Sequence, residues 1–155
     1  MPALALRAAT PDDAPAIAAL VNAAFAVEKA FVDGERTSVA EIQQLLGQGV
    51  FLVTDGGAAP AACAYIEQRG YRAYLGMLSV DPARQGEGLG KRMMTAVEEY
   101  CRSRRVRAID IKILSLRTEL PPFYVKLGFV EEGTGPYENP LCTKPAHFIL
   151  MSKNL

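Results

Sequence analysis

The segment that decides the fold reads Val80-Asp81-Pro82-Ala83-Arg84-Gln85-Gly86-Glu87-Gly88-Leu89-Gly90-Lys91. It follows an extended apolar run and precedes a run with helical periodicity, so it predicts a turn from a strand into a helix. The glycines at 86, 88 and 90 permit positive φ and lack the Cβ atoms that would keep a ligand away. The unpaired amides at the start of the helix add roughly half a positive charge. The turn is therefore predicted to bind an anion such as pyrophosphate through backbone N–H groups.

The glycine spacing narrows the kind of anion site. A P-loop requires GxxxxGK followed by Ser or Thr, whereas Lys91 is followed by Arg92 and no glycine precedes it at the required distance. The dinucleotide-binding fingerprint GxGxxG also fails, because the third glycine comes one residue too early. For these six residues taken alone, a structural turn that binds nothing stays open as the alternative.

Patterns on both sides of this turn predict a layered arrangement of helices and strands. Ahead of it, two amphipathic helices are followed by three extended runs that are typical of an antiparallel meander. The expected helices cover residues 10–25, 38–47, 89–103 and 121–128, and the expected strands cover residues 50–54, 60–68, 71–80, 107–114, 129–130 and 147–151. Because the sequence contains neither a repeat nor a linker, residues 1–155 are expected to form one mixed α/β domain.

Composition narrows the classes of function. Seventeen Lys and Arg residues balance seventeen Asp and Glu residues, so no net positive field attracts nucleic acid or an anionic membrane. No run approaches the roughly 20 apolar residues of a membrane span, and the N-terminus lacks a secretory signal, so a cytoplasmic protein is expected. Cys63, Cys101 and Cys142 show no metal-ligand spacing, and neither a metal site nor a disulfide framework is predicted. The first two are expected to be buried as small apolar residues.

Three segments together carry a resemblance to a known family. Residues 85–90 read Gln-Gly-Glu-Gly-Leu-Gly, residues 76–82 read Gly-Met-Leu-Ser-Val-Asp-Pro, and residues 123–129 read Phe-Tyr-Val-Lys-Leu-Gly-Phe. The first resembles the Q/R-x-x-G-x-G/A loop with which the GNAT superfamily of N-acyltransferases binds the pyrophosphate of acyl-CoA. The second resembles the family's strand beside the pantetheine arm, and the third resembles its F-Y-x-x-x-G-F segment. The order of elements is similar over nearly the whole chain.

The resemblance implies a fold and an activity. The implied fold is GNAT-like, of the α+β kind, with a mixed, mainly antiparallel central sheet of about six to seven strands flanked by about four helices. The implied activity is N-acetyl transfer from acetyl-CoA, as co-substrate, to a small-molecule or peptide amine, without a metal. The implied CoA-binding residues are Leu78, Ser79, Val80, Gln85, Gly86, Glu87, Gly88, Leu89, Gly90 and Lys91. A non-catalytic acyl-CoA-binding regulatory module stays open, because a binding loop alone does not establish turnover.

Acyl transfer to an amine requires a group that takes the ammonium proton and a group that assists the departing thiolate. Tyr124 aligns with the tyrosine that the family often places near the thioester sulfur, so the resemblance implies that role; the alternative is a core aromatic. The backbone N–H of Leu78 is implied as a donor to the developing oxyanion. The strand over residues 73–80 lacks the family's glutamates, so the base stays open between Glu119, other candidates and a water relay.

The acceptor site is expected between residues 26–37 and 133–145, because loops on a rigid sheet commonly carry specificity. Glu28, Phe31 and Glu35 predict a pocket for a cationic amine with an apolar flank, although the same composition fits an ordinary mobile loop. Glu28, Glu35 and His147 are also candidates for the base. Apolar residues cluster on several strands, which leaves a homodimer open.

Overall fold

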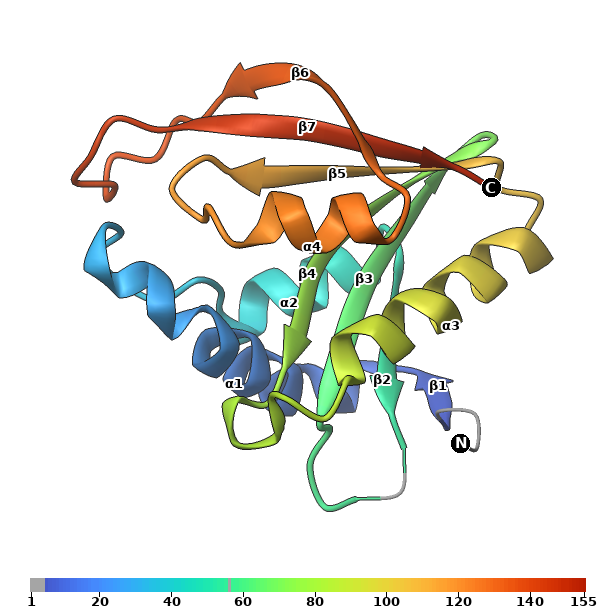
Figure 1. Cartoon of the computed structure of the whole chain (residues 1–155). Helices are drawn as coiled ribbons and strands as arrows, with labels where there is room; N and C mark the ends of the chain where they lie inside the picture. The colour runs from blue at the N-terminus through green and yellow to red at the C-terminus, as the bar shows by residue number, and fades with distance from the viewer. Residues whose placement is uncertain (1–4, 56) are drawn as a thin grey trace.

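The computed structural model describes residues 5–55 and 57–155, and its centre is a seven-stranded sheet with the order β1-β2-β3-β4-β5-β7-β6 (Figure 1). The strands are β1 (Leu6–Ala8), β2 (Val50–Thr54), β3 (Ala62–Arg69), β4 (Arg72–Val80), β5 (Ala108–Leu114), β6 (Val130–Pro136) and β7 (His147–Asn154). Neighbouring strands are antiparallel except β4 and β5, which are parallel. The predicted mixed, mainly antiparallel sheet is confirmed.

In the described residues, four α-helices cover the two faces of this sheet, as predicted. They are α1 (Ala14–Ala24), α2 (Val39–Leu46), α3 (Leu89–Ser103) and α4 (Leu120–Lys126), and short 3-10 turns are η1 (Pro11–Asp13), η2 (Phe25–Ala30) and η3 (Pro82–Arg84). On one face α1 and α2 bury Ile17 and Ile42 against Phe51. On the other face α3 and α4 bury Met93 and Tyr124 in a second cluster. The sheet thus separates two hydrophobic clusters, and Figure 1 shows the two pairs of helices on its opposite sides.

The start of α1 differs slightly from the expected helix at residue 10. Asp13 accepts hydrogen bonds from the backbone N–H of Thr10 at 2.8 Å and from the Arg7 guanidinium at 2.7 and 2.8 Å. These bonds hold the pKa of the Asp13 carboxyl well below its usual range. The first turn is therefore a 3-10 turn, and the α-helix begins at Ala14.

The last two strands are longer than the sequence pattern predicts. β6 runs to Pro136, so the connection expected over residues 133–145 begins inside a strand. The extension follows from pairing with β7, which supplies hydrogen-bond partners that local sequence does not reveal. A register shift between Glu131 and Gly133 places one extra residue, Glu132, in β6. The turn expected around Asp55 contains Gly56, which lies outside the described residues together with Met1–Leu4.

Cys63 and Cys101 are buried, as predicted, with 0% and 1% exposure. Burial raises the pKa of these thiols to about 12 and about 11, so both stay protonated at neutral pH. Across the described part of the chain, none of the helices combines the length and the apolar character that crossing a membrane requires.

Candidate active site

The candidate active site is a cavity between β4 and β5, at the place where these two strands separate. These parallel strands pair only over Arg72–Tyr74 and Ala108–Asp110, although β4 continues to Val80 and β5 to Leu114. Figure 1 shows them diverging beyond the paired part. A cavity of about 860 Å³ opens there, within the range of roughly 300–1,000 Å³ that is usual for ligand sites. Its walls also include residues of η2, of the turn at residues 85–90 (the glycine turn), of α4 and of the loop before β7.

A bulge in β4 shapes the wall of this cavity. Cys63 pairs with Ser79 and Tyr65 pairs with Gly76, so β4 contains one residue more than β3 over this part. Met77 has a φ of 50°, which is unusual for a residue with a side chain. Bulges re-aim neighbouring groups, and Met77 and Leu78 both line the cavity.

The glycine turn forms one end of the cavity. Gly86 and Gly88 have φ values of 90° and 76°, and a Cβ added to either would meet no atom within 4 Å. Gly88 is also the N-cap of α3, whose first amides follow it. The turn therefore presents open backbone at a helix N-terminus, which is the arrangement that favours an anion. Eight of the predicted CoA-binding residues line the cavity: Leu78, Val80, Gln85, Gly86, Gly88, Leu89, Gly90 and Lys91.

Ser79 and Glu87, the other two predicted CoA-binding residues, are not among those that line the cavity. The Ser79 side chain is 2% exposed, and its hydroxyl donates a hydrogen bond of 3.0 Å to the carbonyl of Met77. It thus supports the bulge from inside the protein. The Glu87 carboxylate pairs with Arg84 at 3.0 Å on the outside of the turn.

Tyr124 lines the cavity from α4 and is also part of the core. It is 8% exposed and packs edge-on against Phe123 and Phe129, with ring centroids 5.1 and 5.4 Å away. Burial raises the pKa of the Tyr124 phenol to about 12, although the positive charge of Arg117 opposes the rise. The phenol is therefore a hydrogen-bond donor throughout the neutral range.

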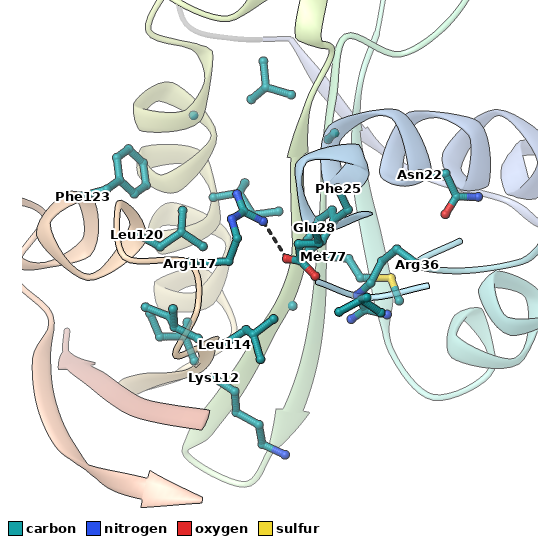
Figure 2. A pocket seen from close by; sticks show the side chains of 18 of the residues that line it. Asn22, Phe25, Glu28, Arg36, Met77, Lys112, Leu114, Arg117, Leu120 and Phe123 are labelled. Atoms are coloured by element: carbon teal, nitrogen blue, oxygen red, sulfur yellow. Dashed lines mark hydrogen bonds and ion pairs between the residues drawn. The ribbon is translucent and has the colours of Figure 1, made fainter. Parts of the chain in front are cut away.

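An ion pair crosses the cavity from η2 to the loop before α4. Arg117 Nη1 lies 2.6 Å from Glu28 Oε2, and each side chain is 13% exposed (Figure 2). The Arg117 guanidinium carbon also lies 5.7 Å from the centroid of the Phe25 ring. Glu28, which the sequence suggested as an acceptor contact, thus lies at the cavity with its charge already matched.

The other residues that the sequence suggested as the base or as acceptor contacts differ in whether they line the cavity. Glu119 is not among the lining residues; its side chain is 61% exposed and contacts the cavity only through Arg117, at 3.1 Å. Glu35 lines the cavity and pairs with Lys29 at 2.9 Å. Neither Phe31 nor His147 is among the lining residues, and His147 is exposed at the start of β7.

The two segments expected to build the acceptor site meet each other. Thr143 N–H donates to the carbonyl of Phe31 at 2.8 Å, and Asp33 N–H donates to the carbonyl of Leu141 at 2.9 Å. An antiparallel bridge joins Val32 to Cys142. The loops therefore form one hydrogen-bonded edge of the cavity, whose lining includes Asp33 and Leu141.

Sequence reasoning missed Arg117 and Arg36 as cavity residues. Arg117 is 89 positions from its partner Glu28, and no local pattern relates the two. Arg36 belongs to residues 26–37, where the sequence pointed to acidic residues as acceptor contacts. Its guanidinium carbon lies 5.4 Å from the Phe25 ring centroid. Figure 2 shows both arginines with Phe25 and Glu28 at the cavity.

Comparison with known proteins adds independent information on this fold. The model of the acetyltransferase (GNAT) family matches residues 16–129. Comparison with curated proteins gives no match.

Solved structures are similar over nearly the full chain. Ribosomal-protein-S18-alanine N-acetyltransferase from Escherichia coli has a TM-score of 0.79 at 18% identity, with 96% of this chain and 92% of that chain covered. Ribosomal-protein-alanine N-acetyltransferase from Brucella melitensis has a TM-score of 0.77 at 22% identity, with 98% and 100% covered. The PaiA N-acetyltransferase from Thermoplasma acidophilum, solved in complex with coenzyme A, has a TM-score of 0.79 at 13% identity, with 99% and 100% covered. At these identities the structures establish the shared fold.

Proposed function

Because this chain belongs to the acetyltransferase (GNAT) family, we propose that it transfers an acetyl group from acetyl-CoA directly to a primary amine. One observation carries the proposal: the open glycine turn and the Tyr124 phenol line the same cavity, which passes between two diverging strands. A pyrophosphate at the turn would direct the acyl end of the co-substrate into that cavity. The acceptor amine would then enter from the side of η2.

The residues present fit a CoA molecule. The amides that follow Gly88 can donate to a pyrophosphate, and the side of Gly86 and Gly88 on which a Cβ would project is free of protein atoms. Lys91, in the first turn of α3, adds a positive charge at the cavity. Leu78 and Val80 line the route between the splayed strands, where the pantetheine arm would lie.

Tyr124 is proposed to assist the departing thiolate. Its raised pKa keeps the proton on the phenol, so the hydroxyl would donate a hydrogen bond to the sulfur. The backbone N–H of Leu78, beside the bulge, is proposed as the donor to the oxyanion. Deprotonation of the amine is proposed to run through water, since Glu28 is held by Arg117 and Glu119 reaches the cavity only through the same arginine.

The proposal is tested by calorimetric titration with acetyl-CoA, followed by thiol-release assays with a panel of primary amines. Saturable binding and release with at least one amine are expected. Binding without release from any amine would favour the non-catalytic acyl-CoA-binding module. Absence of CoA binding would contradict the proposal and leave the glycine turn a structural feature.

Substitution of Gly88 by valine is expected to raise the Kd for CoA at least about tenfold. A β-branched residue at a φ of 76° is strained by roughly 1–2 kcal/mol, and its side chain would project into the space proposed for the pyrophosphate. Gly70→Val is the matched control, because Gly70 has a φ of 67°, equally open surroundings and no place in the cavity lining. Equal effects of the two variants on CoA affinity, measured by calorimetry, would contradict a site at the turn.

A further inference from the structure

The charges around the acceptor end of the cavity do not match an acidic site. Two carboxylates that suggested such a site from the sequence are already paired: Glu28 with Arg117 at 2.6 Å and Glu35 with Lys29 at 2.9 Å. Their negative charge is matched within the protein, so they offer little net attraction to a cationic acceptor. The charges that remain must decide which acceptor is favoured.

Arg36 is a cavity cation whose ion pair with a carboxylate is long. Its nearest carboxylate among the described side chains is that of Glu41, at 3.9 Å, the outer limit of an ion pair. That carboxylate also accepts a hydrogen bond from Thr37 Oγ1 at 2.5 Å. The Arg36 side chain is 38% exposed and lies against Phe25, so its donors can reach a ligand.

The backbone beside Arg36 is held in place. The side chain of Asn22, on α1, accepts a hydrogen bond from Thr37 N–H at 2.9 Å and donates one to the Thr37 carbonyl at 3.1 Å. Thr37 itself is 8% exposed. Arg36 therefore extends from an anchored point, which lowers the entropic cost of binding a ligand with it.

Lys112, on β5, is a second cation at the cavity. Its ammonium lies 5.7 Å from the ring centroids of both Tyr74 and Phe148, and no carboxylate of the described residues lies within ion-pair distance of it. Burial raises the pKa of the Tyr74 phenol, and the positive charge of Arg36 opposes that rise. Lys112 and Arg36 thus both lie near Tyr74, Lys112 on β5 and Arg36 in the segment that follows η2.

From this arrangement we propose that the preferred acceptor is a small amine that also carries a carboxylate, such as a free amino acid. Arg36 would bind the carboxylate, Lys112 would add its field, and the amine would point toward Tyr124. Asp33 and Glu138, the other carboxylates that line this end of the cavity, are exposed, as are Arg36 and Lys112. The inference rests on the proposed N-acetyltransferase function and adds the class of acceptor.

The test compares amino acids with the amines that differ from them only by loss of the carboxylate, for example phenylalanine with phenethylamine. For the wild-type protein, kcat/KM is expected to be higher for the amino acid. Arg36→Gln is expected to lower kcat/KM for the amino acid about tenfold or more and to leave that for the amine within about twofold. Lys112→Gln should act in the same direction but less strongly, and Arg36→Lys should restore part of the activity.

Arg69→Gln is the matched control, because Arg69 lies 5.2 Å from the Tyr74 ring centroid but does not line the cavity. It should leave both substrates unaffected, and the Kd for CoA should be unchanged in every variant. For each substrate, kcat/KM of the variant is divided by that of the wild-type protein. The difference in basicity between the two amines therefore does not affect the result. Equal losses for both substrates in Arg36→Gln, or a wild-type preference for the decarboxylated amine, would overturn the inference.

Failure of the proposed function gives a different result. If no amine releases thiol, the acceptor inference is examined by calorimetric titration of phenylalanine into the CoA-saturated protein. Binding that Arg36→Gln weakens, without binding of phenethylamine, would support a carboxylate site in a non-catalytic module. Absence of binding for both would overturn it.

Discussion

Replacement of Tyr124 by phenylalanine is expected to lower kcat by about 10²-fold or more, while the Kd for CoA changes by less than about twofold. The hydroxyl is the only group removed, and the ring keeps its edge-on contacts with Phe123 and Phe129. The loss should therefore be confined to the step in which the thiolate departs. Steady-state kinetics with the best amine of the panel, together with calorimetry for CoA, measures the two quantities.

Tyr71→Phe is the control for this experiment, since Tyr71 is 65% exposed on the hairpin between β3 and β4 and does not line the cavity. It should leave kcat unchanged. The pH profile gives a second check. Because burial raises the pKa of Tyr124 to about 12, the phenol stays protonated up to about pH 11, and its titration should cause no loss of kcat between pH 7 and 10. Unchanged turnover in Tyr124→Phe, or an alkaline loss in this range that disappears in the variant, would contradict the assigned role.

Replacement of Arg117 by leucine is expected to lower the free energy of unfolding by about 3 kcal/mol. The Glu28 carboxylate is 13% exposed, and loss of its partner at 2.6 Å would leave a largely buried charge uncompensated. Denaturant titration of the wild-type protein and the variant measures the difference. Arg84→Leu removes one partner of an exposed pair, with side chains 49% and 51% exposed, and should cost less than about 1 kcal/mol.

The double variant Glu28→Gln, Arg117→Leu separates loss of the pair from loss of packing. Removing the stranded charge should recover at least about 1 kcal/mol relative to Arg117→Leu alone, because the remaining amide is easier to bury than a carboxylate. A double variant that is less stable than the wild-type protein by the full sum of the two single-variant effects would show that the two side chains act independently. The ion pair would then have no role in joining η2 to the loop before α4.

Much of the fold could be predicted from local patterns. The strand over Val50–Thr54 and the helix over Val39–Leu46 have the boundaries expected from hydrophobic periodicity and from the capping signal at Ser38, whose side chain accepts from Glu41 N–H. The glycine turn was also predictable, because the positive φ angles of Gly86 and Gly88 are a property of those residues and their immediate neighbours.

The acceptor end of the cavity was less predictable. The sequence predicted Glu28 and Glu35 as part of a pocket for a cationic amine, but each has a basic partner in the folded chain. The sequence pattern also ended the strand β6 too early, because β6 continues to Pro136 only by pairing with β7. Both outcomes depend on which distant segments come together, and hydrophobic periodicity carries no information on charge pairing.

The sequence alone determined the order of the helices and strands and the strand-to-helix turn at residues 85–90. Each of these follows from backbone preference and side-chain periodicity over a few neighbouring residues. Only the tertiary structure decided where β4 and β5 part, which loops meet at the cavity edge, and that Glu28 and Glu35 each pair with a basic residue there. These features arise from contacts such as that between Glu28 and Arg117, whose energy depends on distance and burial in space and not on position along the chain.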